Sequence, residues 1–600
     1  EGLLPTVTLS LAMGSQRMAR KKALIKTLTS VETLGSVTVI CTDKTGTLTQ
    51  NVMEAKNFWS DGEIHGMEYL KNSALLAVIA GLCNNARFID GQYSGDPTEV
   101  ALLKAVRENV GDLEGERIFE IPFDSERKRM TTVNIIEGKK LALTKGALES
   151  VLPLCSHMLM NGKEVKMDER LREMAMDAYR SLTGMGLRVL SFAYRELKDR
   201  GTSTVNPDEM ENGLVFAGLV GIEDPPRPEV PEAIRRCREA GIKVIMITGD
   251  GSRTAVAIAR EIGLVKGEPV VIEGHEFERM GERELRERLS GKEVIFARMT
   301  PKYKMRVVSV LKEEGERVAV TGDGVNDAPA LKKADIGIAM GVAGTDVAKE
   351  SADMILLDDN FATIVNAIEE GRAVYENIKK FISYIFSSNI PEIVPYLAYV
   401  LFRIPLPLTI MQILAVDLGT DMLPALALGA EKPTRELMKQ PPRSPKERLL
   451  NLRLLSRAYL FLGPIEAAAA MFGFFYVLNS GGWRWGEMLA ADNHLYMQAT
   501  TVCLTAIVVT QVANVFACRS FRESVFSIGF FSNRLIFAGI AFELLFQLFI
   551  VYHPLGNRIF STRPIPLKMW LVLIPFAVML FAAEELRKYF RAGRYRTSSP

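Results

Sequence analysis

Cysteine is scarce in this sequence, and its six cysteines are scattered along 600 residues. They form no Cys-x-x-Cys pair and no metal-ligand spacing, so we expect no disulfide framework and a reduced, cytosolic environment for the soluble part. The 73 basic and 71 acidic residues leave a net charge of +2, which argues against binding to nucleic acid. No Gly-x-x-x-x-Gly-Lys-[Ser/Thr] loop occurs, which disfavours the P-loop class of ATPases.

No signal peptide is recognisable, and the sequence opens at Glu1 with an apolar run that ends near Met13. This run is too short to cross a bilayer of about 30 Å. A basic stretch from Arg17 to Lys26 follows, as expected where a helix leaves the membrane on its cytoplasmic side. We therefore expect residues 1–16 to be the second half of a membrane helix whose start is missing.

The hydrophobic residues are spread unevenly. Roughly the first 370 residues resemble soluble protein, whereas long apolar runs dominate the remainder. We expect membrane helices at 377–402, 407–429, 455–478, 493–517, 527–552 and 566–585. The loop 431–457 is rich in Lys and Arg, so the positive-inside rule places it in the cytoplasm.

Three apolar strands are each followed at once by an acidic loop. The pairs are Val37–Cys41 with Asp43-Lys-Thr-Gly-Thr, Val244–Ile247 with Thr248-Gly-Asp250, and Val318–Val320 with Thr321-Gly-Asp-Gly-Val-Asn-Asp327. Apolar strands that alternate with helices imply a parallel sheet, whose ligands sit at the carboxyl ends of the strands. The sequence therefore predicts that the three loops meet in one place.

The residues of these loops suit phosphoryl transfer. The carboxylate of Asp43 can attack a γ-phosphoryl group, because this reaction needs positioning and charge neutralisation more than a strong nucleophile. Asp323 offers hard oxygen to Mg²⁺, and Lys304 could contact the phosphoryl oxygens. The neighbouring candidate residues are Thr248, Gly249, Asp250, Asn326 and Asp327.

With these motifs the chain resembles the P-type ATPase family along its whole length. The resemblance implies a haloacid-dehalogenase-like Rossmannoid α/β phosphorylation domain, an inserted α+β nucleotide-binding domain and a bundle of membrane α-helices. It implies ATP and Mg²⁺ as cofactors, with Asp43 as the phosphorylated residue. By the same resemblance Asp43, the Thr45 carbonyl and Asp323 would hold Mg²⁺, while Thr248 and Lys304 bind the phosphoryl group.

Domain boundaries follow from this interpretation. We expect the phosphorylation domain at 17–53 and 216–370, the nucleotide-binding domain at 54–215, six transmembrane helices within 371–590 and a cytoplasmic tail at 591–600.

The inserted region contains candidate nucleotide-binding residues. Phe123 alone favours a core residue, but the string Phe123-Asp-Ser-Glu-Arg-Lys-Arg-Met130 resembles the adenine-stacking segment of the family. The further positions that match nucleotide-binding residues of the family are Glu99, Lys145, Gly146, Arg188 and, near the hinge between the domains, Asp224.

Acidic residues inside membrane helices are costly and are therefore functional candidates. Glu392 lies in the first expected complete helix, and Asp417 and Asp421 lie at i, i+4 on one face of the second. The further candidate ligands are Glu1, Ser388, Asn389 and Thr420. Such oxygen ligands suit Na⁺, K⁺, Ca²⁺ or protons rather than copper or zinc.

The run from Ser388 to Asp421 resembles type II pumps, above all those for sodium and potassium. Calcium pumps of the reticulum type usually carry asparagine where Asp417 stands. Ser388 stands where the gastric proton pump has lysine. The stretch Gln511-Val-Ala-Asn514 stands where the animal sodium pump has an acid. The identity of the transported ion is therefore left open. Glu466 is interpreted either as an extra ligand or as an acid at a helix end.

We expect an ion pump in the plasma membrane with its soluble domains in the cytoplasm, and two other functions compete with this interpretation. A membrane-tethered phosphatase of the dehalogenase class would not need acids buried at bilayer depth, and a scaffold would not need Asp43, Lys304 and Asp323. The Thr-Gly-Glu loop of the family's actuator domain does not occur in the sequence. We therefore expect the chain to bind nucleotide and accept phosphate without completing a transport cycle, which needs the missing N-terminal actuator region. Whether an accessory subunit exists is left open by the sequence.

Overall fold

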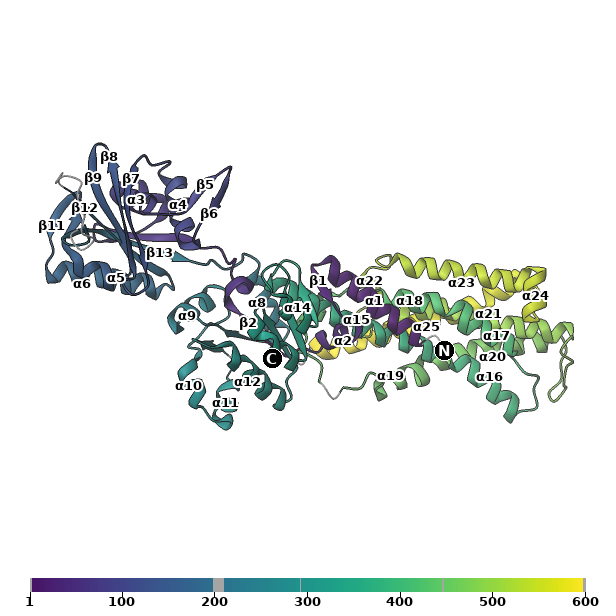
Figure 1. The fold of residues 1–600 in the computed structure, drawn as a ribbon. Coiled ribbons are helices and arrows are strands. Elements are labelled where there is room, and N and C mark those ends of the chain that lie inside the picture. Colours follow the sequence, from purple (N-terminus) through teal and green to yellow (C-terminus); the bar gives the residue numbers. More distant parts are fainter. Residues whose placement is uncertain (1–2, 198–209, 292, 445–446, 597–600) are drawn as a thin grey trace.

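The computed structural model describes residues 3–197, 210–291, 293–444 and 447–596. The chain is elongated, with a mainly antiparallel sheet at one end, a parallel sheet flanked by helices in the middle and a helical bundle at the other end (Figure 1). Glu1, expected to be a cation ligand, lies outside the described residues.

The middle sheet has eight strands, and all neighbouring strands are parallel except β1 and β19. In spatial order they are β1 (Ala23–Ile25), β19 (Met354–Leu356), β18 (Ile336–Met340), β17 (Val318–Gly322), β2 (Val39–Asp43), β14 (Lys243–Ile247), β16 (Val294–Ala297) and β15 (Val270–Glu273). The central strands are buried almost throughout, as the apolar runs predict for a parallel sheet covered on both faces. The three strands with acidic ends lie side by side, since β2 pairs with β14 on one edge and with β17 on the other.

A second sheet of nine strands is inserted between β2 and β14. Its strands are β3 (Glu54–Ser60), β4 (Glu63–Gly66), β7 (Glu116–Asp124), β8 (Arg129–Ile136), β9 (Lys139–Gly146), β10 (Cys155–Met160), β11 (Lys163–Lys166), β12 (Arg188–Glu196) and β13 (Leu214–Glu223). The expected boundary between residues 215 and 216 falls inside β13. Since β13 pairs with β12 and β3 through Glu223, the second sheet ends about eight residues later than that boundary.

Five helical segments of the described chain are long and apolar enough to cross a membrane. They are Ile410–Gly429, Leu452–Ser480, His494–Ala517, Arg534–Tyr552 and Leu567–Phe590, and each overlaps one of the expected segments.

The remaining expected segment, 377–402, is built differently. It contains the end of α15 (Phe361–Ser388) and all of α16 (Ile390–Leu401), which meet at Asn389. Pro391 stands at the start of α16, where the missing N–H group does not interrupt a helix. α15 begins directly after the middle sheet, so one helix of about 42 Å connects that sheet to the bundle.

Candidate functional site

The three acidic loops meet at the carboxyl ends of β14, β2 and β17. Asp43 is the last residue of β2, and its backbone N–H donates to Thr321 Oγ1 of β17 at 2.9 Å. On the other side, Lys44 Nζ lies 2.7 Å from Asp250 Oδ2 in the turn after β14. The turn itself is held by a 3.1 Å bond from the Asp250 N–H to Thr248 Oγ1. The predicted convergence of the loops is therefore present in the structure.

Lys304 lies at the centre of this junction. It belongs to α12 (Pro301–Glu313), and its side chain is 2% exposed. Its ammonium donates to both oxygens of Asp43, at 2.8 and 2.7 Å, and to Asp327 Oδ1 at 3.1 Å. The other oxygen of Asp327 accepts backbone N–H groups of Asp323 and Gly324, which fixes the loop after β17 around the lysine.

Charge is unbalanced at this site. Burial raises the pKa of Asp43 to about 6, opposed by Lys304 and assisted by the carboxylates of Asp327 and Asp323. Burial lowers the pKa of Lys304, but the charges of Asp43 and Asp327 outweigh it, and the net pKa is raised. Three carboxylates thus share one ammonium, an excess of negative charge that a divalent cation would neutralise.

The residues expected to hold Mg²⁺ fit this charge. Asp43 and Asp323 supply hard carboxylate oxygen and interact electrostatically, and Thr45 lies in the turn that directly follows Asp43. Gly46 has φ of +76°, so the chain can turn sharply directly after Thr45. Within the described residues no group of three His, Cys, Asp or Glu side chains is placed to hold a metal ion. Asn326 is exposed at the start of the short helical turn Val325–Asp327.

The candidate nucleotide residues lie on the second sheet. Phe123, near the end of β7, is 64% exposed, which excludes its interpretation as a core residue and leaves its ring free to stack. Lys145 of β9 forms a 2.6 Å ion pair with Glu99 of α4 (Pro97–Asn109). Arg188 opens β12 and donates to Thr98 Oγ1 at 3.4 Å.

Gly146 of β9 permits a close approach of this strand to its neighbour β8. A Cβ atom there would lie 2.6 Å from the carbonyl oxygen of Lys128 and 2.6 Å from Arg129 Cβ. A larger residue at position 146 would therefore displace the strand that carries Lys145.

The hinge between the sheets involves a residue that sequence reasoning did not single out. Arg227 donates to the carbonyl oxygens of Gly46 at 3.0 Å and of Thr49 at 3.1 Å, and so grips the loop that follows Asp43. Asp224 accepts from Thr49 Oγ1 at 2.5 Å and from the Val52 N–H at 3.3 Å. Both oxygens of Asp224 are thus engaged by the hinge, and its expected contact with ribose stays a prediction.

A second polar site lies inside the bundle, around Asp421. This side chain is buried and accepts hydrogen bonds from Tyr384 Oη at 3.1 Å and from Ser388 Oγ at 3.4 Å. Gln511 joins the same site, because its amide donates to Ser388 and its oxygen accepts from Thr420 Oγ1. The expected cation ligands Asp421, Ser388 and Thr420 are therefore linked by hydrogen bonds between neighbouring helices.

Asp417 and Asp421 are separated by a distorted turn. The Asp421 N–H donates to the Val416 carbonyl five residues back, so residues 416–420 form a π-turn rather than a regular α-helix. Such turns occur often at functional sites. Asp417 is half-buried, and it interacts electrostatically with Glu392, whose Oε1 atom is buried without a hydrogen-bond partner.

Two further carboxylates reach this site from other helices. Glu466 of α20 (Gly463–Ser480) and Glu543 of α23 (Arg534–Tyr552) are 0% exposed, and both interact electrostatically with Asp421. Sequence reasoning missed Glu543, although an acid inside an apolar run was the available signal. Glu466 lies in the first turn of α20, directly after the π-turn Ala458–Leu462, as the interpretation as a helix-end acid expects, but its side chain is buried in the bundle.

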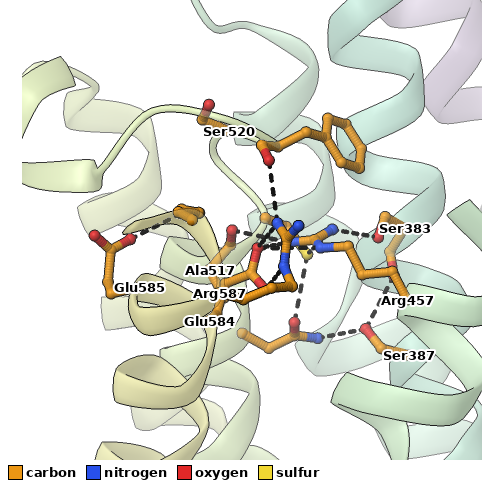
Figure 2. Close-up of polar contacts among 12 residues, drawn as sticks. Ser383, Ser387, Arg457, Ala517, Ser520, Glu584, Glu585 and Arg587 are labelled. Atoms are coloured by element: carbon orange, nitrogen blue, oxygen red, sulfur yellow. Dashed lines mark hydrogen bonds and ion pairs between the residues drawn. The ribbon is translucent and has the colours of Figure 1, made fainter. Parts of the chain in front are cut away.

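A buried ion-pair network stabilises the bundle beside this site (Figure 2). Arg457 donates to Glu584 Oε1 at 2.8 Å, to Ser383 Oγ at 2.7 Å and to the Ala517 carbonyl at 3.1 Å. Arg587 also donates to Glu584 Oε1, at 2.6 Å. The network joins α15 to α19 (Leu452–Arg457), α21 (His494–Ala517) and α25 (Leu567–Arg596).

Comparisons with known proteins assign three parts of the chain to described families. A family model described as "P-type ATPase, cytoplasmic domain N" matches residues 72–229, one for haloacid dehalogenase-like hydrolases matches 305–368, and one for the C-terminus of cation transporting ATPases matches 405–590. These matches, with the two kinds of domain in the structure, confirm the predicted fold class.

Three relatives cover nearly the whole chain. The sodium/potassium-transporting ATPase subunit alpha-4 of Rattus norvegicus is 40% identical over 674 aligned residues, which cover 98% of this chain and 65% of the relative. The subunit alpha of Drosophila melanogaster is also 40% identical, with the same shares covered, and the subunit alpha-2 of Gallus gallus is 40% identical with 98% and 66% covered. The chain thus spans about 65% of the length of these relatives, and it belongs to the P-type cation-transporting ATPases of type II.

Proposed function

We propose that this protein is an ATP-driven cation pump that conserves the energy of ATP as an acyl phosphate on Asp43. The observation that carries the proposal is the placement of the buried Lys304 ammonium on both oxygens of Asp43, where the strand-end loops meet. A lysine in this position neutralises charge that develops on a transferred phosphoryl group.

In the proposed reaction an oxygen of Asp43 forms a bond to the γ-phosphorus of ATP. The bond from that phosphorus to the oxygen bridging the β- and γ-phosphates breaks, and ADP leaves. Mg²⁺, held by Asp43, the Thr45 carbonyl and Asp323, would supply further neutralisation of the phosphoryl oxygens. Phe123 and Lys145 would hold the nucleotide, and water would later hydrolyse the acyl phosphate.

α15 offers a physical route from the phosphorylation site to the cation site. Its N-terminus follows Asp359, whose carboxylate accepts backbone N–H groups of Gly341, Val342 and Ala343 after β18. At its other end Tyr384 and Ser388 donate to Asp421. A shift of the loop after β18 can therefore reach the cation ligands through one helix.

The cargo that the site supports best is a hard cation bound by oxygen, with Na⁺ and K⁺ first and Ca²⁺ next. The relatives are sodium/potassium-transporting ATPases. The resemblance of the stretch around Asp417 to sodium and potassium pumps favours the same cargo. Asn514 is uncharged and donates to Ser387 Oγ at 2.7 Å, so this position supplies a hydrogen bond and no negative charge. A proton as cargo remains the alternative, and the plasma membrane is the proposed location, with both sheets in the cytoplasm.

The test measures ³²P incorporation from [γ-³²P]ATP into the purified chain while Na⁺, K⁺ and Ca²⁺ are varied one at a time. We expect at least one ion to change the phosphoenzyme level, and Asp421→Asn to shift the concentration at which that ion acts. A matched control is Asp90→Asn, which removes one exposed carboxylate from the hairpin β5–β6 (Arg87–Ile89 and Gln92–Ser94). Phosphorylation that ignores all three ions and also does not change with pH would instead support a membrane-tethered phosphatase.

A further inference from the structure

Glu466 is a buried carboxylate to which the resemblance gives no role. It lies on α20, its side chain is 0% exposed, and neither Oε1 nor Oε2 has a hydrogen-bond partner among the described residues. An ionised carboxylate without hydrogen bonds is strongly unfavourable in a low-dielectric interior. Its two oxygens are therefore available to a positively charged ligand.

The neighbours of Glu466 add to this negative charge. It interacts electrostatically with Asp421, Glu392 and Glu543, and the uncharged Tyr384 phenol faces the same group of acids. Arg457, nine residues earlier in the same helical segment, is bound instead to Glu584, Ser383 and Ala517. The acids thus lie together while the nearby arginine is engaged elsewhere.

Packing holds Glu466 close to the ligand helix that carries Glu392. Gly463, one turn before Glu466, lies against Ile390, and a Cβ atom on Gly463 would lie 2.6 Å from Ile390 Cβ. Ile390 precedes Glu392 by two residues at the start of α16. The two helices can therefore approach as closely as they do only because residue 463 has no side chain.

The helix of Glu466 also departs from regular geometry beside its acid, as the other two ligand helices do. The Gly463 N–H donates to the Ala458 carbonyl five residues back, which makes residues 458–462 a π-turn. The helix of Asp421 has a π-turn at 416–420, and α15 and α16 are separated at Asn389. Interrupted helices expose backbone carbonyl groups at the depth where membrane proteins bind ions.

We propose that Glu466 is a direct carboxylate ligand of a transported hard cation at the site around Asp421. α20 then belongs to the cation path, and the site neutralises more positive charge than Glu392, Asp417 and Asp421 alone would allow. This inference rests on the proposed function, because it places a new ligand in the same cation site.

The experiment measures equilibrium binding of ²²Na⁺, ⁸⁶Rb⁺ (as a substitute for K⁺) and ⁴⁵Ca²⁺ to the purified 600-residue chain in detergent. Four proteins are compared: the wild type, Glu466→Gln, Glu392→Gln and Glu487→Gln. Glu487 is an exposed residue of the loop after α20, so its variant controls for the loss of one negative charge. We expect Glu466→Gln to lose one bound cation per chain or to bind about tenfold more weakly, and Glu487→Gln to bind as the wild type does.

Two results overturn the inference, and they differ in what they say of the proposed function. If Glu392→Gln loses binding while Glu466→Gln keeps the wild-type number and affinity, Glu466 is no ligand, but the cation site stands. If the wild type binds none of the three ions, the inference fails, and so does the proposal that Na⁺, K⁺ or Ca²⁺ is the cargo. Should Glu466→Gln not fold, Glu466→Asp keeps the charge and shortens the side chain, and unchanged selectivity among the ions in that variant also overturns the inference.

Discussion

Replacing Lys304 by methionine would remove the ammonium from Asp43 while keeping most of the aliphatic side chain. The ammonium lies 2.8 and 2.7 Å from the two oxygens of Asp43 and 3.1 Å from Asp327 Oδ1. Its loss leaves three neighbouring carboxylates without their shared counter-charge. The variant tests whether phosphorylation depends on that charge.

The expected size of the effect has two parts. With the pKa of Asp43 at about 6, roughly nine-tenths of this carboxylate is ionised near pH 7. An opposite charge at such distances typically lowers a carboxylate pKa by about 1 to 3, so its removal should leave between about one half and one hundredth ionised. Loss of a donor to the transferred group costs a further factor of about 10² to 10³ in rate. Together we expect phosphorylation near pH 7 to slow by about 10² to 10⁵.

Rapid-quench measurement of ³²P incorporation from [γ-³²P]ATP gives this rate. Lys302→Met is the matched control, because Lys302 lies in the same first turn of α12 with a side chain that is 69% exposed. Raising the pH to about 9 should restore only the part of the loss that comes from ionisation of Asp43. A Lys304→Met variant that is phosphorylated as fast as the control near pH 7 would refute the role of the lysine.

Three further predictions concern metal, stability and nucleotide. The folded pKa of Asp43, about 6, lies above its ordinary value of 3.8, so its contribution to stability is full below pH 3.8 and is lost as the pH rises through 6. Mg²⁺ favours the ionised form of Asp43. Calorimetry should therefore show a larger Mg²⁺-induced rise in Tm near pH 7.5 than near pH 5. Equal rises at the two pH values would contradict this prediction. Glu584→Gln leaves the buried Arg457 without a carboxylate and should cost about 3–5 kcal/mol of bundle stability. Arg587→Met keeps the Arg457–Glu584 pair and should cost about 1 kcal/mol. Thermal unfolding in detergent can check that Glu584→Gln is the more destabilising variant. Phe123→Ala should weaken ATP binding by about 1–3 kcal/mol in a fluorescent-nucleotide titration without lowering Tm. Phe119, on the same strand, is 41% exposed, and Phe119→Ala should leave ATP binding unchanged.

Local signals were sufficient to predict the phosphorylation site. Each of its three loops follows a short apolar run, and a parallel sheet necessarily brings such strand ends to one edge. The exposure of Phe123 was less predictable, because it depends on the position of β7 at the edge of its sheet. The boundary near residue 215 was missed, since β13 is as apolar as a strand of the middle sheet and only its pairing with β3, β10 and β12 assigns it to the second sheet.

The membrane site was predicted only in part. Glu392, Asp417 and Asp421 were identified because acids stand out within apolar runs, and the same signal was overlooked at Glu543. The burial of Glu466 and the π-turns at 416–420 and 458–462 depend on how neighbouring helices pack. Periodicity in a single helix does not contain that information, nor does it reveal that Arg227 binds the loop after Asp43.

The account depends most directly on Asp43 as the residue that accepts phosphate. The decisive measurement is ³²P transfer from [γ-³²P]ATP to the wild type, to Asp43→Asn and to Asp90→Asn, with each sample then treated with hydroxylamine. We predict label on the wild type and on Asp90→Asn that hydroxylamine removes, as it does from an acyl phosphate, and no label on Asp43→Asn. Label of the same amount and the same sensitivity on Asp43→Asn would contradict the account.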